Sequence, residues 1–230
     1  MRIIFVRHAQ PDYKQDCLTP IGHLQAQAAA ERLKDEPIAK IYSSTCGRAI
    51  ETAEYVARQK GLAIEEKFDF MRELRWGRLD DIPIAHNGQP WFTVGEMVRT
   101  GQSVVKPEWQ TEEPFSKNLK LLALVEPIAQ SFDQLLSSYG LDREGEYYRV
   151  RCCDESTIAM VSHAGSSSIV LSHLFNLPFP FFCAAISPAF TAITVVTFLG
   201  KPGELVSPRF ELVNDARHIA GINTEQFFGN

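Results

Sequence analysis

An arginine and a histidine, Arg7 and His8, directly follow the apolar run at residues 3–6. The run is β-branched and aromatic, which predicts a short buried strand. Open α/β sheets bind ligands at the carboxyl ends of their strands, so these two side chains are placed to meet a ligand. An imidazole beside a guanidinium suits attack on a phosphoryl group, because the guanidinium holds and neutralises the phosphate oxygens. The pair therefore indicates phosphoryl transfer.

A second arginine and a second histidine follow other predicted strands. Arg48 lies in the first turn of a predicted helix, where free backbone amides already favour an anion. His163 follows the apolar run at residues 157–162, and Gly165 just after it permits a close approach of the backbone. Because a parallel sheet brings such strand ends to one edge, we expect His8 and His163 to lie together. Taken singly, Arg48 would be a solvated surface side chain and a strand-end histidine would be structural.

The candidate proton donor is Glu73, which stands between apolar neighbours in the segment 71–77. Partial desolvation near Trp76 would raise the pKa of this carboxyl and suit it to protonate a leaving group. The alternative is a charge pair with Arg72 or Arg75 on a loop surface. The local sequence leaves both interpretations open.

Alternating strands and helices must position these side chains. We predict strands at residues 3–6, 39–43, 157–162, 190–199 and 209–213, with a short extended piece at 62–64. We predict helices from about residue 20, at 48–60 before Gly61, at 91–100, at 117–139 and directly after residue 165. Strands separated by helices imply an α/β fold, a three-layer αβα sandwich with a mostly parallel central sheet.

The start of the first helix is marked by Thr19 and Pro20. Threonine can cap the free amides of a helix, and proline suits the first helical position. We expect this helix to carry Leu24, Ala28 and Leu33 on one face.

Periodicity is lost between residues 80 and 116, where glycine, proline and tryptophan accumulate. We interpret this stretch as an inserted, partly helical lid in a single domain that spans residues 1–230. Its aromatic side chains suggest an apolar or aromatic part of a substrate under the lid. The alternative is that they pack the insertion onto the core. The side chains concerned are Trp91, Phe92, Trp109 and Phe115.

Five sequence blocks occur in order between residues 7 and 165. They are Arg7-His8-Ala9, Leu18-Thr19-x-x-Gly22-x-x-Gln25-Ala26, Ser43-Ser44-x-x-x-Arg48-Ala49-x-Glu51-Thr52-Ala53, Arg72-Glu73-x-x-x-Gly77 and Ser162-His163-Ala164-Gly165. Together they resemble the histidine phosphatase superfamily, which includes cofactor-dependent phosphoglycerate mutases and many small-molecule phosphatases. The residues after 165 contribute only a compatible strand pattern.

The resemblance implies a role for each candidate side chain. His8 would be the nucleophile that accepts the phosphoryl group as a phosphohistidine. Arg7, Arg48 and His163, with the backbone amide of Ala164, would line the phosphate pocket and stabilise the transition state.

The resemblance also assigns the proton donor. One branch of the family places its donor next to the second histidine, but here Ala164 follows His163, so Glu73 takes the position used by the mutase-like branch. Glu73 would protonate the leaving alkoxide and then deprotonate the water that hydrolyses the phosphoenzyme. No metal and no other cofactor is implied, and the six histidines show no compact metal-ligand spacing.

The first block departs from the mutase-like pattern, which continues with a tryptophan and an asparagine. The asparagine would touch the bound phosphate, and Gln10 is its candidate replacement. Thr19 and Trp91 are the other expected substrate contacts.

A mutase needs extra positive charge to hold a bisphosphorylated cofactor. Residues 77–116 carry three basic side chains against six acidic ones, which is a poor cradle for a bisphosphate. The sequence therefore predicts a metal-independent phosphomonoester phosphatase for a small phosphorylated metabolite. The alternatives are a phosphoglycerate mutase-type phosphotransferase and a non-catalytic module that binds phosphorylated ligands on the same fold.

Composition limits the partners. The net charge of -5 argues against nucleic acid, because binding to a phosphate backbone needs a basic surface. The longest apolar segment, residues 177–198, is broken by three prolines and argues against a membrane span. Five cysteines without regular spacing favour reduced thiols and a cytoplasmic location. Substrate identity and oligomeric state stay open.

Overall fold

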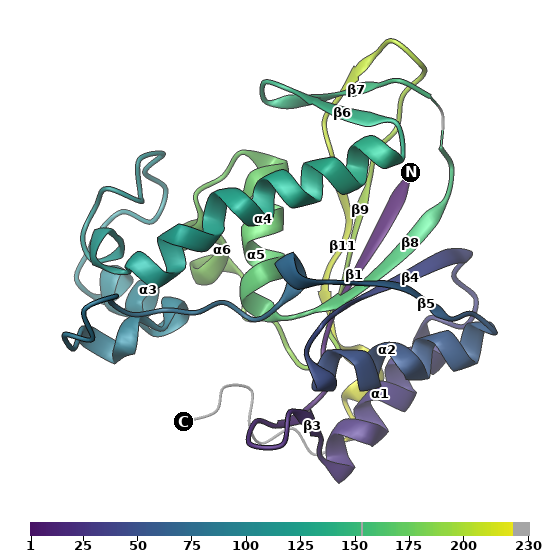
Figure 1. Cartoon of the computed structure of the whole chain (residues 1–230), viewed down its shortest axis with the longest axis horizontal. Coiled ribbons are helices and arrows are strands. Elements are labelled where there is room, and N and C mark those ends of the chain that lie inside the picture. Colours follow the sequence, from purple (N-terminus) through teal and green to yellow (C-terminus); the bar gives the residue numbers. More distant parts are fainter. Residues whose placement is uncertain (153, 223–230) are drawn as a thin grey trace.

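A six-stranded sheet forms the centre of the computed structural model, which describes residues 1–152 and 154–222 (Figure 1). The strands run in the order β11-β9-β1-β8-β4-β5. Their bounds are β1 (Arg2–Arg7), β4 (Ile38–Ser44), β5 (Ile64–Phe68), β8 (Thr157–Ser162), β9 (Ile193–Thr197) and β11 (Arg209–Asp215). Only β9 runs against the others, pairing antiparallel with β1 and β11. The prediction of a mostly parallel sheet is confirmed.

Helices cover both faces of the sheet (Figure 1). On one face lie α1 (Pro20–Arg32) and α2 (Gly47–Lys60), and on the other lie α4 (Leu119–Ser138) and α5 (Ala164–Phe175). Successive side chains of a strand point to opposite faces, so both faces of β1 need apolar residues. Ile4 and Val6 pack with the α2 layer, whereas Ile3 and Phe5 pack with the α4 layer. This explains the unbroken apolar run before Arg7 and confirms the three-layer sandwich.

The predicted boundaries of α1 and α2 are confirmed. The Thr19 hydroxyl accepts a hydrogen bond from the amide of Gly22 at 3.0 Å, and Pro20 opens α1. Gly61 ends α2 in the left-handed region at a φ of 66°, where glycine has no steric penalty.

The predicted apolar face of α1 is wrong. Leu24 is 55% exposed and Ala28 is half-buried, although Leu33 beyond the helix end is buried. The buried face instead carries small side chains such as Ala26 and Ala29. Helix α1 packs against α2, and small residues at this contact allow the two helices to approach closely.

The other predicted helices and strands are found near their predicted positions, and the structure contains several further short elements. The extended piece expected at 62–64 is the approach to β5, which begins at Ile64. Short elements that the periodicity did not reveal are β2 (Pro11–Asp12), β3 (Cys17–Leu18), β6 (Leu141–Glu144), β7 (Tyr147–Val150), β10 (Leu205–Val206) and α6 (Phe179–Ala185). Single 3-10 turns lie at Asp69–Met71, Ala85–Gly88, Phe115–Lys117 and Arg217–Ile219. Strands of two to four residues are too short to show a period.

The segment 80–116 contains one helix, α3 (Pro90–Arg99), close to the predicted position. Its C-terminal part packs onto the core through aromatic rings. Trp109 lies edge-on to Phe115 at 5.2 Å between ring centroids and 5.6 Å from Phe179 of α6. Trp109 and Phe115 are both buried, so for these two side chains the packing alternative holds.

Within residues 1–152 and 154–222, no single helix has the length and apolar character to cross a membrane. The pair α5 and α6 meets that test only together, and the chain bends by 118° between them. The cysteines in this part of the chain are free thiols: Cys17, Cys46, Cys152 and Cys183.

Candidate active site

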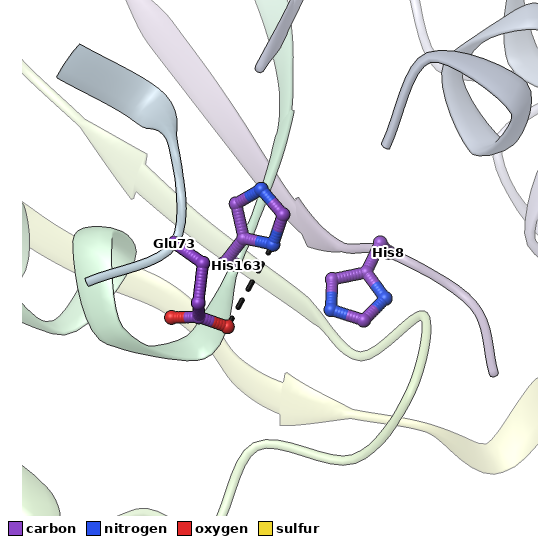
Figure 2. Close-up of side chains that lie close together, drawn as sticks. All are labelled: His8, Glu73 and His163. Carbon is purple, nitrogen blue, oxygen red and sulfur yellow. Dashed lines mark ion pairs between the residues drawn. The ribbon is translucent and has the colours of Figure 1, made fainter. Parts of the chain in front are cut away.

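The two candidate histidines lie side by side at the carboxyl ends of neighbouring strands (Figure 2). Strands β1 and β8 pair in parallel with Arg7 opposite Ser162, so the residues that follow them, His8 and His163, leave the sheet together. The amide of His8 continues the ladder by donating to the Ser162 carbonyl at 2.9 Å. The two imidazole centroids are 4.9 Å apart. The parallel pairing thus brings together side chains 155 positions apart in the chain (163 − 8).

The hydrogen bonds of His8 fix which nitrogen can react. Nδ1 lies 2.7 Å from the carbonyl oxygen of Ala9. A carbonyl only accepts, so Nδ1 carries the proton and Nε2 carries the lone pair. Nε2 is buried and has no hydrogen-bond partner among the described residues. Burial, followed by His163 and the two nearby guanidiniums, lowers the pKa of His8 well below 6.5. The result is a neutral imidazole with an unused basic nitrogen.

His163 is held by hydrogen bonds from both ring nitrogens. Nδ1 accepts from Arg48 Nη2 at 3.2 Å, and Nε2 donates to the Ser44 hydroxyl at 2.9 Å. Glu73 Oε2 lies 3.7 Å from Nδ1, on the side marked by the dashed line in Figure 2. Burial and the neighbouring cations lower the pKa of His163 well below 6.5, so the ring is neutral. Its orientation is set before any ligand binds.

Two buried guanidiniums complete the cluster. Arg7 donates to the carbonyl oxygen of Pro188 and lies 4.3 Å from the centroid of the Phe190 ring. Arg48 pairs with Asp16, so it is not the solvated surface side chain that it would be when taken singly. The two Nε atoms have no hydrogen-bond partner among the described residues. Two guanidiniums beside neutral imidazoles form a site for an anion such as phosphate.

Glu73 reaches the same place from an extended segment after the turn at Asp69–Met71. Its Oε1 accepts from the amide of Leu74 at 3.1 Å, and the side chain is 24% exposed. Desolvation raises the pKa of the carboxyl above 4.5, although the two guanidiniums act in the opposite direction. Arg72 pairs with Asp69 at 3.5 Å rather than with Glu73. The carboxyl is therefore suited to exchange protons at the edge of the anion site.

Gly165 allows the Glu73 segment to pack this closely. A Cβ atom at this position would lie 2.5 Å from Leu74 Cγ and 2.9 Å from Glu73 Oε1. We expect Gly165→Ala to destabilise the protein by about 1–3 kcal/mol, because the added methyl must displace the Glu73 segment. Urea unfolding gives the measurement. Gly95→Ala is the control, since this helical glycine has only the flexible end of Arg99 within 4 Å. Equal midpoints for the two variants would contradict the close contact.

A cavity of about 360 Å³ opens over the two guanidiniums and Glu73, and neither His8 nor His163 is among its described lining residues. Its lining combines two guanidiniums, one carboxyl, four aromatic rings, one glutamine and one alanine. These residues are Arg7, Tyr13, Arg48, Glu73, Trp76, Gln89, Trp91, Phe92 and Ala164. Ala164 is the first residue of α5, so backbone amides of the first helical turn lie beside the anion site, where the Gly165 amide bonds to Glu73. Three substrate contacts were expected, Gln10, Thr19 and Trp91, and of these Trp91 lines the cavity.

Gln10 and Thr19 have other partners. The Thr19 hydroxyl donates to Gln10 Oε1 at 2.7 Å while it caps α1, and the backbone N–H of Gln10 donates to Gln25 Oε1 at 2.8 Å. Neither residue lines the cavity. Their polar side chains instead connect the loop after β1 to the start of α1.

Several residues of the site escaped the sequence argument. Asp16 and Tyr13 lie in the turn between β2 and β3, where the Tyr13 ring centroid is 5.4 Å from the Arg48 guanidinium carbon. Ser44 orients His163, and its place in the third sequence block was the one available signal. For Asp16 and Gln89, nothing in the local sequence pointed to the site.

Three side chains of the site also have the spacing needed to hold a single metal ion. His8, Glu73 and His163 each offer one ligand atom, and these atoms lie within 4.8 Å of one another. The positive charges of Arg7 and Arg48 would repel a metal cation at this position. Both ring nitrogens of His163 already take part in hydrogen bonds, to Arg48 and Ser44. The charge distribution therefore fits an anion better than a metal ion.

Comparison with known proteins points to one family. The family model described as the histidine phosphatase superfamily (branch 1) matches residues 3–113. No curated protein matches the sequence. Among solved structures, the protein called mycobacterial hydrolase 1 has 20% identity and a TM-score of 0.64, covering 93% of this chain and 98% of that one.

Two further structures are similar over nearly the whole chain. The mycobacterial glucosyl-3-phosphoglycerate phosphatase with VO3 has 21% identity and a TM-score of 0.61, covering 93% of this chain and 98% of that one. The Entamoeba histolytica phosphoserine phosphatase with 3-phosphoglyceric acid has 19% identity and a TM-score of 0.61, covering 95% and 98%. At these identities the likeness shows the fold. The family match places residues 3–113 in the histidine phosphatase superfamily, and the solved structures show the same fold over nearly the whole chain.

Proposed function

We propose that the protein is a phosphomonoester phosphatase that acts through a phosphohistidine on His8 and needs no metal ion. The observation that carries the proposal is the buried, unpartnered Nε2 of a neutral His8 next to two guanidiniums. A buried nitrogen of this kind can attack only an electrophile that lies beside it, and the two guanidiniums would hold an anionic electrophile in that place. A phosphoryl group meets that description.

The reaction follows from the positions of the groups. Arg7 and Arg48, with the amides at the start of α5, hold the phosphate oxygens, and His163 orients the Arg48 guanidinium beside them. His8 Nε2 attacks phosphorus, the ester P–O bond breaks, and Glu73 gives its proton to the leaving oxygen. Glu73 then takes a proton from a water molecule that attacks phosphorus, the P–N bond breaks, and inorganic phosphate leaves. The neutral imidazole is restored, so the cycle closes without a metal ion.

The charges of the segment 80–116 and its surroundings favour a phosphatase over a mutase. Each basic side chain of residues 77–116 pairs with an acid from the same stretch: Arg78 with Asp80 at 2.5 Å, Arg99 with Glu96 at 2.6 Å, and Lys106 with Glu112. None of the three lines the active-site cavity. A bisphosphorylated cofactor would therefore meet no further cation for its second phosphate among the described residues that line this cavity. The similar structures named as phosphatases support the same choice.

A panel of small phosphate esters assayed with EDTA tests the proposal. We expect release of inorganic phosphate that EDTA does not reduce, and an acid-labile phosphoprotein after brief mixing with substrate. Activity that requires added metal would overturn the mechanism. Efficient, bisphosphate-dependent interconversion of the two phosphoglycerates would favour the mutase, and binding without turnover or adduct would favour the non-catalytic module.

A further inference from the structure

The cavity beyond the phosphate site is lined by aromatic rings from three separate segments. Tyr13 comes from the turn between β2 and β3, Trp76 from the segment after Glu73, and Trp91 and Phe92 from the start of α3. Tyr13 is 60% exposed and Phe92 is 44% exposed. Buried Trp109 and Phe115 show how aromatic side chains of this protein pack when they serve the core. Trp76 and Trp91 are partly buried against the main core but still line the cavity, so core packing leaves part of each of these rings, and much of Tyr13 and Phe92, open to a ligand.

Two of these rings are held in place. Trp91 donates its indole N–H to the carbonyl oxygen of Ile186 at 3.1 Å. Phe92 stacks on His86 at 5.7 Å, and its amide donates to the capping side chain of Gln89 at 2.8 Å. The polar edge of the indole is thus already used. A fixed ring without a free donor binds a ligand mainly through its apolar face.

The charges of the cavity are unfavourable for a second anionic group on the substrate. Arg7 and Arg48, beside His8, belong to the phosphate site, and the remaining charged side chain among the described lining residues is Glu73. A carboxylate next to the phosphate would lie near Glu73 with no cation of its own. Burying such a charge without a partner is costly. The similar Entamoeba histolytica structure with 3-phosphoglyceric acid contains a ligand that carries such a carboxylate.

We propose that this cavity selects phosphate monoesters of uncharged alcohols with a flat aromatic group close to the ester oxygen. The inference rests on the proposed function, because the ester must first occupy the phosphate site. The aromatic group would lie among Tyr13, Trp76, Trp91 and Phe92, where its ring can face other rings.

Three substrates with alkoxide leaving groups separate the effect of the aromatic ring from the effects of apolar size and of a carboxylate. Benzyl phosphate carries the aromatic ring, cyclohexylmethyl phosphate has the same size without it, and phosphoserine carries the carboxylate. We expect kcat/KM for benzyl phosphate to exceed that for cyclohexylmethyl phosphate about fivefold. We expect it to exceed that for phosphoserine about 100-fold, because the apolar contact is lost and a charge is left unpaired.

Substitutions of the cavity tryptophans test whether their rings cause the preference for benzyl over cyclohexylmethyl phosphate. Trp91→Leu and Trp76→Leu keep apolar side chains but remove the aromatic faces, so each should reduce the benzyl-to-cyclohexylmethyl ratio toward one. Tyr147→Leu is the matched control, because Tyr147 is a 48% exposed aromatic residue on β7, outside the cavity lining. This control should keep the full ratio. Equal kcat/KM for the three esters in the wild type would overturn the inference while leaving the proposed phosphatase intact.

Binding without chemistry distinguishes failure of the inference from failure of the proposed function. Benzylphosphonate cannot be hydrolysed, and its binding beside Trp76 and Trp91 should change the tryptophan fluorescence. We expect it to bind more tightly than cyclohexylmethylphosphonate, even if no ester is turned over. Equal affinity for the two phosphonates would overturn the aromatic site, whereas absent turnover with the expected binding order would overturn only the phosphatase.

Discussion

His8→Ala is expected to lower the turnover of phosphate esters by a factor on the order of 10⁴ or more. The substitution removes the one ring nitrogen of the site that is basic, buried and unpartnered. No neighbouring group can replace it, because both nitrogens of His163 are engaged by Arg48 and Ser44. The acid-labile phosphoprotein should also disappear. Steady-state kinetics and rapid acid quenching give the two measurements.

Two control variants and a rescue experiment separate loss of the nucleophile from loss of the fold. His23→Ala removes an exposed histidine that contacts Tyr55 outside the cavity, and it should keep nearly full activity. Gln10→Ala should weaken activity less than His8→Ala, since the Gln10 side chain bonds to Thr19. Added imidazole should partly restore turnover in His8→Ala by occupying the vacated space and attacking phosphorus itself. Undiminished activity in His8→Ala would refute the assignment of the nucleophile.

Glu73→Gln is expected to lower kcat for alkyl phosphates by a factor of about 10²–10⁴, because the amide cannot protonate an alkoxide. p-Nitrophenyl phosphate should behave differently, since its leaving group needs no proton. Phosphorylation of His8 should remain fast for this substrate, but hydrolysis of the phosphoenzyme should slow without a base for the water. Stopped-flow absorbance should therefore show a burst of one p-nitrophenolate per site, followed by slow release.

The pH profile provides a second readout for the same variant. His8 must be neutral, and its pKa is lowered, so activity should fall only as the pH drops below 6.5. Glu73 must be protonated for the first step, and its pKa is raised, so activity should fall as the pH rises through a value above 4.5. In Glu73→Gln the alkaline limb of kcat for alkyl phosphates should vanish. Suppose instead that kcat falls by the same factor for all esters, that no burst is seen, and that both the acid and the alkaline limb of the pH profile remain. Glu73 would then have only a structural role.

Periodicity and local capping were sufficient to predict the elements that hold the site. The apolar runs of β1 and β8 are buried on both faces, so their strands could be identified without long-range information. Thr19, Pro20 and Gly61 mark helix ends through interactions with their own neighbours in the chain. For the same reason the strand-end placement of His8 and His163 could be predicted.

The sequence alone determined which chemistry the chain can carry, because the types of Arg7, His8, Arg48, Glu73 and His163 and their places after strands are local facts. The tertiary structure decided how these groups are tuned and what surrounds them. The small-residue face of α1 and the pairing of Asp16 with Arg48 depend on contacts between distant segments. The free Nε2 of His8 and the aromatic wall of the cavity likewise arise only when separate loops meet over the sheet. Hydrogen-bond partners and desolvation are properties of a three-dimensional neighbourhood, and no local pattern encodes them.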